Sequence, residues 1–392
     1  MQKKELDVYV RLQRHLDRQP VGFPATPSGA EIRILRHIFT PGEAEIAACL
    51  SWRPEPLERI YERAGHLTPS SGKLEKILER IREKGGLESS VQDGRTHYAN
   101  APLVVGMYEM QVDRLTPQFV RDFNEYTGDR RFGIEFLSTA LPQMRTIPVA
   151  KSIQPRHHAA PFDAVTPLIE GADAPFVLLP CICRKKREME GAPCRVTDEK
   201  ETCLAMGGIA RSILLGGTGR EISRREAMAV ITQNQQAGLV LQPSNTEKAE
   251  FICSCCGCCC GMLDICRKLP RPLDYWAANF QAAVDPGRCT GCGLCEQRCQ
   301  VGAVCVPEKG GPAVVDLDRC IGCGVCVAAC PTEAVMLKKK SEEVRPPRTR
   351  EDLYGILMAR KKGRLEKLKL TGKLIVDAVR TGRTDLLKRL AG

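Results

Sequence analysis

The 392-residue sequence has few histidines, few aromatic residues and no long hydrophobic run. Only 6 residues are His, and aromatic residues make up 5% of the chain. No apolar run approaches the roughly 20 residues that a transmembrane helix needs, so we expect no membrane span. The opening residues, 1–7, lack the apolar core of a secretory signal peptide, and we therefore expect a cytoplasmic protein.

Signatures of nucleotide binding and of side-chain catalysis are also missing. No P-loop or flavin fingerprint is present, and the glycines of residues 216–219 do not complete a G-x-G-x-x-G pattern. We therefore interpret residues 216–219 as a loop. No group of residues has the pattern of an acid–base or nucleophilic catalyst, so the sequence favours a carrier or a subunit over a stand-alone enzyme.

Cysteine, in contrast, is abundant, with 21 residues in the chain. Thiols stay reduced in a cytoplasm, so this density indicates metal ligands rather than disulfides. Two runs have the spacing C-x2-C-x2-C-x3-C, which wraps a short loop around an iron–sulfur cube. Zinc fits them less well, since its sites usually pair two cysteine couples. The two runs are Cys289, Cys292, Cys295, Cys299 and Cys320, Cys323, Cys326, Cys330.

Residues 279–338 resemble the bacterial two-cluster ferredoxin, in which the fourth cysteine of each run ligates the other cluster. The resemblance implies one 4Fe–4S cluster on Cys289, Cys292, Cys295 and Cys330, and a second on Cys320, Cys323, Cys326 and Cys299. In that family a proline follows each fourth cysteine. Pro331 fits this pattern, whereas Gln300 replaces the first proline. Cys305 lies outside the pattern, and we expect it to be buried.

A second group of eleven cysteines lies between residues 181 and 266. The spacing of Cys253, Cys256 and Cys259 again suits three corners of a cube, and Cys255 and Cys258 form an interleaved pair. Cys181, Cys183, Cys194 and Cys203 are candidate ligands for a further cluster or for a structural zinc ion. The sequence leaves their grouping open and predicts one or two additional iron–sulfur clusters here, with zinc as the alternative.

Residues 176–335 are also similar to ferredoxin-like proteins of anaerobic bacteria and archaea. The shared features are a Pro-Cys-x-Cys-Arg segment at residues 180–184, the cysteine-rich stretch of residues 251–261, and the two C-terminal runs. This resemblance implies electron transfer in a low-oxygen cytoplasm, and it leaves the partner unspecified.

Residues 29–110 are predicted to form several helices followed by a hairpin with an Asp93-Gly94 turn. This order resembles the winged-helix domains of bacterial regulators. A helix over residues 73–84 carries alternating charges, which suits protein contact better than DNA, although DNA binding remains an alternative. A further helix is expected over residues 115–127, with Thr116 as its N-cap and Pro117 in its first turn.

Basic residues are concentrated in the tail. Residues 338–392 contain 17 Lys and Arg against 7 Asp and Glu, a net charge of +10. Two helices are expected there, with basic outer faces. They could pack on the protein, bind an acidic subunit or lie on an anionic membrane surface.

Together these features predict a multidomain α+β protein. Its expected parts are a winged-helix-like domain (1–128), a connector (129–175), a cysteine-rich α/β domain (176–270), a ferredoxin-like module (279–338) and a helical tail (346–392). The predicted function is iron–sulfur electron transfer, alone or as a subunit of an anaerobic oxidoreductase, to or from redox partner proteins. The alternatives are a redox-sensing transcriptional regulator and an oxidoreductase with its substrate centre in residues 176–266.

Overall fold

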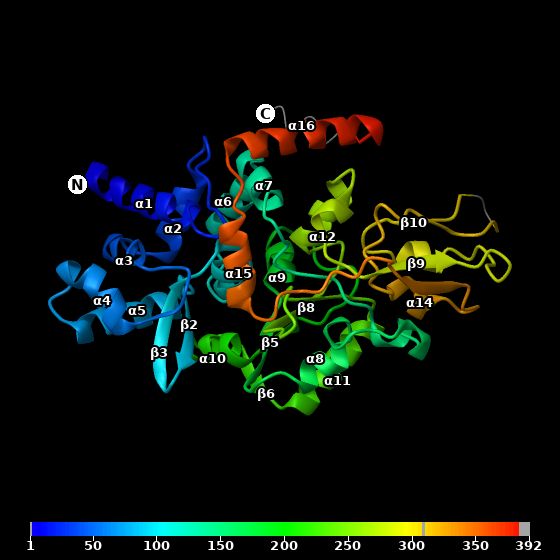
Figure 1. The fold of residues 1–392 in the computed structure, drawn as a ribbon, viewed down its shortest axis with the longest axis horizontal. Helices are drawn as coiled ribbons and strands as arrows, with labels where there is room; N and C mark the ends of the chain where they lie inside the picture. The colour runs from blue at the N-terminus through cyan, green and yellow to red at the C-terminus, as the bar shows by residue number, and fades with distance from the viewer. Residues whose placement is uncertain (1, 308–309, 384–392) are drawn as a thin grey trace.

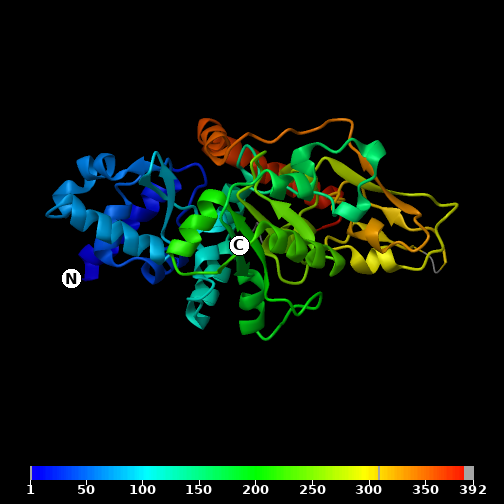
Figure 2. The same cartoon turned by 90° about the horizontal axis from the view of Figure 1, so that it is seen from below.

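The computed structural model describes residues 2–307 and 310–383. The molecule is elongated, with the N-terminal domain at one end, a cysteine-rich sheet in the middle and the two tandem cysteine runs at the other end (Figures 1 and 2). Helices and strands are mixed throughout, as predicted. Among the described residues, no helix has the length and apolarity that crossing a membrane requires.

The N-terminal domain consists of helices around a small antiparallel sheet of order β1-β3-β2. Its hairpin joins β2 (Leu87–Gln92) to β3 (Arg95–Asn100) through Asp93 and Gly94, whose φ angles are 50° and 75°. Positive φ at both turn residues is what a two-residue hairpin requires, so the predicted turn is confirmed. The remaining elements are α1 (Gln2–Asp17), α2 (Ala30–Ile38), α3 (Pro41–Ala47), β1 (Glu55–Pro56), α4 (Leu57–Ala64) and α5 (Ser71–Glu83).

Two helices follow the hairpin: α6 (Pro117–Gly128) and α7 (Arg130–Leu137). Thr116 caps α6, because its side chain accepts a hydrogen bond from the backbone N–H of Phe119. This confirms the helix start that the sequence predicts. Packing of α6 on α2 through Phe119 and Phe123 joins these helices to the N-terminal core.

The central domain is a five-stranded antiparallel sheet of order β6-β4-β5-β8-β7. Helices α8 and α11 pack on one face of the sheet, and α10 packs on the other together with the hairpin strand β2. Helix α11 begins with a capping box formed by Ser223 and Glu226. The elements are α8 (Val165–Glu170), β4 (Phe176–Pro180), α9 (Ile182–Met189), β5 (Glu201–Met206), α10 (Gly207–Leu215), β6 (Arg220–Ile222), α11 (Arg224–Gln236), β7 (Val240–Pro243), β8 (Phe251–Cys255) and α12 (Gly261–Lys268).

The tandem cysteine runs form a compact module of two similar halves. Strand β9 (Phe280–Val284) pairs with β12 (Val335–Lys339), and β10 (Val304–Cys305) pairs with β11 (Val314–Val315). Each cysteine loop leads into a short helix, α13 (Leu294–Arg298) or α14 (Val325–Ala329). Cys305 is exposed, so its predicted burial is wrong. Val304, the preceding residue of β10, packs into the module core, and side chains alternate along a strand, so Cys305 points to the other, exposed face.

Residues 129–175 pack closely on the central domain. Met144 and Ile147 make isolated bridges to Ser244 and Leu241, which places this segment beside the edge strand β7. Arg145 is 2% exposed and pairs with the fully buried Asp163. The segment therefore contributes to the core around the sheet.

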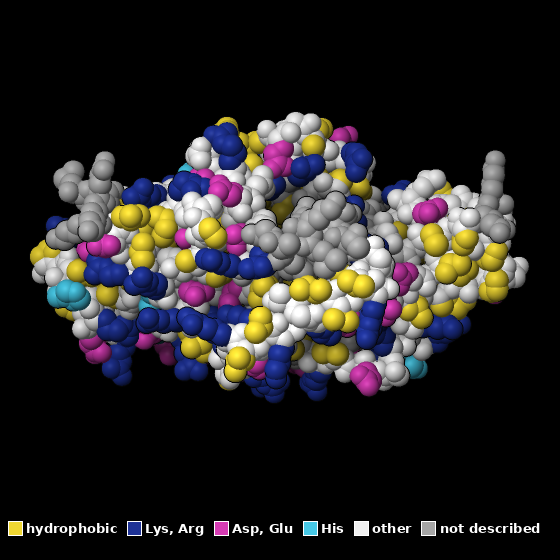
Figure 3. All heavy atoms as spheres, turned by 90° about the horizontal axis from the view of Figure 1, so that it is seen from above, with side chains coloured by type: hydrophobic (Ala, Val, Ile, Leu, Met, Phe, Trp, Pro, Cys, Tyr) yellow, Lys and Arg dark blue, Asp and Glu magenta, His cyan; other side chains and the backbone are white. Residues whose placement is uncertain are grey.

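The tail forms α15 (Arg350–Ala359) and α16 (Arg364–Arg380), which pack back on the protein. Lys367 pairs with Glu135, and Lys373 pairs with Asp274. The exposed face of α16 carries basic residues, as expected, but hydrophobic side chains also lie exposed among the charges (Figure 3). These are Leu365, Leu368, Ile375, Val376 and Val379. The last part of the expected helical tail (346–392), residues 384–392 with Leu386, Leu387 and Leu390, lies outside the described residues.

Candidate metal centres

The alternation of side chains along the central sheet brings four cysteines onto one face. Strand register pairs Leu179 with Cys203 and Leu204 with Ile252, so Cys203 and Cys253 are neighbours across β5 and β8. Successive side chains of a strand point to opposite faces, so Cys253 and Cys255 share a face. Cys181 follows directly after β4, beyond the irregularity at Pro180.

Two more thiols complete a closed ring of six, which we call the six-thiol site. Cys183 comes from the first turn of α9, and Cys260 immediately precedes α12. Each sulfur contacts the next through S–H···S interactions. The order around the ring is Cys181, Cys183, Cys260, Cys255, Cys253 and Cys203. Six converging thiols in a largely buried position form a donor set that suits an iron–sulfur cluster.

A separate group of Cys194, Cys256, Cys258 and Cys259 forms the four-thiol site. All four sulfurs lie within 4.8 Å of one another. The Sγ of Cys194 is 3.6 Å from that of Cys256 and 3.7 Å from that of Cys258, and Cys256 and Cys258 are 3.5 Å apart. A tetrahedral zinc ion with Zn–S bonds of about 2.3 Å requires sulfurs about 3.8 Å apart. The spacing therefore fits one metal ion, because a cube holds its cysteine sulfurs farther apart.

Arg184 lies between the two sites. Its side chain is 4% exposed and donates hydrogen bonds to the Thr202 hydroxyl and, at 3.0 Å, to the Ser254 carbonyl. Burial disfavours the charged form, but the thiolates of Cys181 and Cys256 outweigh it and raise the pKa of Arg184. This guanidinium is thus a fixed positive charge beside two groups of thiolates.

The same charge acts on the four-thiol site. The Cys259 thiol donates to Cys256 and, with help from Arg184, lowers the pKa of Cys256 to about 5 despite the opposing effect of burial. A thiolate is the form of cysteine that binds metal. Cys256 is therefore a thiolate at neutral pH, whereas burial raises the pKa of Cys258, and the hydrogen bond to Cys256 together with burial raises that of Cys259.

In the tandem module, the loop of each run closes around a separate position. Cys289, Cys292 and Cys295 line one small pocket, and Cys330 of the second run lines the same pocket. Around the second run, Cys299 is close enough to raise the pKa of Cys323 and of Cys326, in addition to the larger effect of burial. The fourth cysteine of each run thus lies beside the other run's loop.

Backbone N–H groups point at the sulfurs of the module. Ala282 donates to the Sγ of Cys320 at 3.2 Å, and Ala303 donates to the Sγ of Cys299 at 3.1 Å. Such hydrogen bonds stabilise thiolates and tune cluster potentials. Gly322 has a φ of +66°, and a Cβ there would come within 2.1 Å of the Phe280 carbonyl oxygen. The tight turn of this loop therefore requires glycine.

Gln300, which replaces the expected proline, connects the module to the four-thiol site. Its side-chain oxygen accepts a hydrogen bond from the N–H of Gly257 at 2.7 Å, and its amide nitrogen donates to the Gly238 carbonyl at 3.2 Å. Gly257 lies between Cys256 and Cys258. The departure from the family pattern thus supplies a contact that proline could not make.

One hydrophobic core joins the six-thiol site to the tandem module. It contains Cys255 and Cys260 together with the fully buried Cys266 and with Cys295, Cys320 and Cys326 of the module. Cys266 belongs to neither thiol site, and burial raises its pKa to about 12, so it is a neutral packing residue.

A protein-family model described as a 4Fe-4S binding domain matches residues 282–305 and again residues 313–336. No curated protein matches the chain. The module therefore contains two tandem 4Fe–4S binding motifs, and its cofactors are two 4Fe–4S clusters. This match covers only the C-terminal module, which we call the ferredoxin module below.

The structure regroups the upstream cysteines that the spacing singles out. It brings Cys181, Cys183, Cys203 and Cys253 together, but it places Cys194 with Cys256 and Cys259 in the other site. Cys255, Cys258 and Cys260 complete the two sites. The sequence paired Cys255 with Cys258, whereas the structure places them in different sites, and it did not single out Cys260. The alternation of β8 is the signal that could have indicated Cys255.

Proposed function

We propose that this chain is an iron–sulfur electron-transfer protein whose ferredoxin module exchanges electrons with a third cluster at the six-thiol site. The continuous hydrophobic core between Cys255 and Cys260 on one side and Cys295, Cys320 and Cys326 on the other carries this proposal. A bound 4Fe–4S cluster gives or takes one electron at a time. The eight cysteines of the module hold its two clusters in the crossed arrangement, with Cys330 beside the first loop and Cys299 beside the second.

The core residues keep water away from the thiolates, and Arg184 offsets their negative charge. Excluding water lowers the local dielectric constant, so each charge and hydrogen bond near a thiolate acts more strongly. Ala282 and Ala303 donate hydrogen bonds to module thiolates, as described above. The chain thus provides a fixed polar environment that tunes the energy of each added electron.

The four-thiol site is best explained as a structural zinc site. The sulfur distances of 3.5–3.7 Å support one tetrahedral ion. Its ligands come from residues 194 and 256–259, so the ion would join the loop after α9 to the loop before α12. Gln300 contacts that loop directly, and a zinc ion there would fix the docking of the ferredoxin module.

The N-terminal domain, which has the element order of a winged helix, serves in this proposal as a docking and covering domain. Its hairpin is occupied by the rest of the chain: Ser89 donates to the Ser212 hydroxyl at 3.1 Å, and Glu88 pairs with Arg350. Because the hairpin already makes these contacts within the chain, it is poorly placed to bind DNA. The partner is a redox protein, and the basic residues of the tail are candidates for its docking site.

The test is a comparison of reduction rates. In a double variant, Cys292→Ala and Cys320→Ala, which removes one ligand from each module loop, we expect a low-potential reductant protein to reduce the six-thiol centre at least tenfold more slowly. Rapid-freeze EPR would follow each signal. Unchanged reduction of the third signal in the double variant would refute the proposed route, and a Cys305→Ser variant is the matched control.

A further inference from the structure

A cavity of about 380 Å³ adjoins the six-thiol site. It lies between the hairpin of the N-terminal domain, the α10 face of the central sheet and the start of α15. Both Cys203 and Cys253 of the thiol ring line it. Cavities of this size, at the meeting of two domains, are where small organic ligands usually bind.

The cavity walls are largely apolar, and their polar residues are a set of acids, one arginine, and the neutral Ser89, Ser90, Gln92, Ser212 and Thr349. Four carboxylates line it, from Glu88, Glu109, Glu250 and Glu351, and Arg350 is its one basic residue. Arg350 is already engaged, because it pairs with Glu88 and lies 3.9 Å from Glu250. When Cys203 and Cys253 hold a cluster, as proposed above, their sulfurs add further negative charge.

The wall also contains a strained residue. Val105 has φ 58° and ψ 57°, a conformation that is unusual for a β-branched side chain. The next residue, Gly106, donates its N–H to the Glu109 carboxylate at 2.7 Å, which holds the strained turn in place. Strain of this kind clusters at ligand sites, where the surroundings maintain it.

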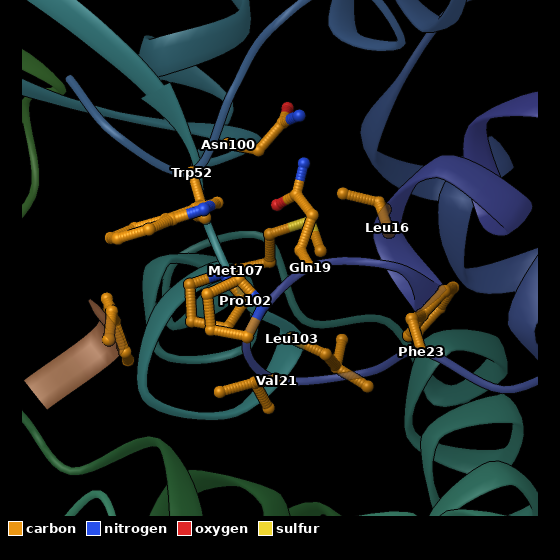
Figure 4. Close-up of a pocket in the computed structure, with 12 residues that line it drawn as sticks. Leu16, Gln19, Val21, Phe23, Trp52, Asn100, Pro102, Leu103 and Met107 are labelled. Atoms are coloured by element: carbon orange, nitrogen blue, oxygen red, sulfur yellow. The ribbon is translucent and has the colours of Figure 1, made fainter. Parts of the chain in front are cut away.

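The small cavity in the N-terminal domain is different. It measures about 20 Å³ and is lined mainly by apolar side chains, with the amides of Gln19 and Asn100 at one end (Figure 4). This volume accommodates a water molecule and no organic ligand. Of these two cavities, only the large one can hold a substrate-sized molecule.

We propose that the large cavity binds an uncharged, largely apolar organic molecule in contact with the six-thiol site through Cys203 and Cys253. The inference rests on the proposed function, because it requires a cluster at the six-thiol site. In this arrangement the cluster exchanges electrons with the bound molecule and does not serve only as a relay between clusters. Anionic ligands are disfavoured, because the acidic side chains that line the space outnumber its single guanidinium, and that guanidinium is already paired with Glu88.

Gly208 provides the means to test this. It lines the cavity near the start of α10, and a Cβ added there would meet only Glu250 Oε1, at 3.8 Å. A larger side chain would thus project toward the cavity without a backbone clash. Gly72 on α5 is the matched control, since a Cβ there meets nothing within 4 Å and the residue is remote from the cavity.

The experiment uses two probes of equal size, 2-naphthalenemethanol and 2-naphthoate, with the full chain purified anaerobically. Equilibrium dialysis should show that the uncharged alcohol binds at least tenfold more tightly than the anion. Gly208→Leu should weaken alcohol binding at least tenfold, and Gly72→Leu should leave it unchanged. In the reduced protein, the alcohol should alter the EPR signal of the third cluster and leave the two ferredoxin signals as they were.

Failure of this inference differs from failure of the proposed function. Tighter binding of the anion, equal binding by the Gly208→Leu and Gly72→Leu variants, or an unchanged third EPR signal with the alcohol bound would each overturn the cavity assignment. Iron limited to the two ferredoxin clusters would instead overturn the proposed third cluster, whatever the dialysis shows.

Discussion

Replacing Arg184 by glutamine should lower the reduction potential of the cluster at the six-thiol site. Arg184 is 4% exposed and lies close enough to Cys181 and Cys203 for their thiolates to raise its pKa against the opposing effect of burial. Adding an electron makes a cluster more negative, and the guanidinium stabilises that added charge. The neutral variant loses this stabilisation.

The size of the effect follows from Coulomb's law. A unit charge about 6 Å away at an effective dielectric constant of about 20 contributes about 3 kcal/mol. For a one-electron couple, 59 mV corresponds to a tenfold change in the equilibrium constant, or about 1.4 kcal/mol, so we expect a decrease of about 100 mV. The two ferredoxin potentials should change much less, since their ligands lie farther from this charge.

The assay is an EPR-monitored redox titration of the anaerobic protein. Arg184→Lys keeps the charge and should shift the potential by less than half as much, although lysine cannot form the same pair of hydrogen bonds. Arg187→Gln, on the same helix and paired with Glu190 at the surface, is the control. The reasoning is refuted if Arg184→Gln behaves like Arg187→Gln or raises the potential.

Three further predictions concern docking, pH and metal content. Gln300→Ala removes two hydrogen bonds and should weaken the docking of the ferredoxin module by about 2 kcal/mol, which should lower the melting temperature. The control Gln297→Ala changes an exposed residue and should melt at the same temperature as the wild type. Burial raises the pKa of Glu109 to about 7. The folded protein therefore holds this proton more tightly than the unfolded chain, and its contribution to stability falls as the pH rises from about 4.5 to 7. Since the side chain is only partly enclosed, the free energy of unfolding of Glu109→Gln should exceed that of the wild type by about 2 kcal/mol at pH 8 and should equal it at pH 4. Equal denaturation curves at pH 8 would contradict this. Cys258→Ser should release zinc with iron unchanged in elemental analysis, and loss of iron as well would argue for a cluster at the four-thiol site.

The two tandem cysteine runs could be predicted from sequence because all their ligands lie in short, regularly spaced loops. A glycine-rich loop fixes the relative positions of three thiolates independently of the rest of the fold. The hairpin at Asp93-Gly94 and the cap at Thr116 were equally local, and both are present. Local chemistry dictates local structure in each of these cases.

Spacing alone could not show which upstream cysteines share a site, because strand pairing brings these cysteines together. Cys203 and Cys253 become neighbours only through the register of β5 with β8, which no spacing reveals. The cavity depends on the hairpin of a distant domain lying against α10. The hydrophobic residues exposed on α16 were not predicted, because the sequence does not show that Lys367 and Lys373 pair with acids on other elements.

The metal and sulfide content per chain, measured on anaerobically purified protein, decides whether the six-thiol site holds a third iron–sulfur cluster. Two ferredoxin clusters account for about 8 iron atoms. We expect about 12 or more iron atoms per chain, with matching acid-labile sulfide, and about one zinc ion, because we propose a cluster at the six-thiol site and a single ion at the four-thiol site. Iron near 8, with any zinc at the upstream cysteines, would contradict the third cluster and reduce the chain to a two-cluster electron carrier.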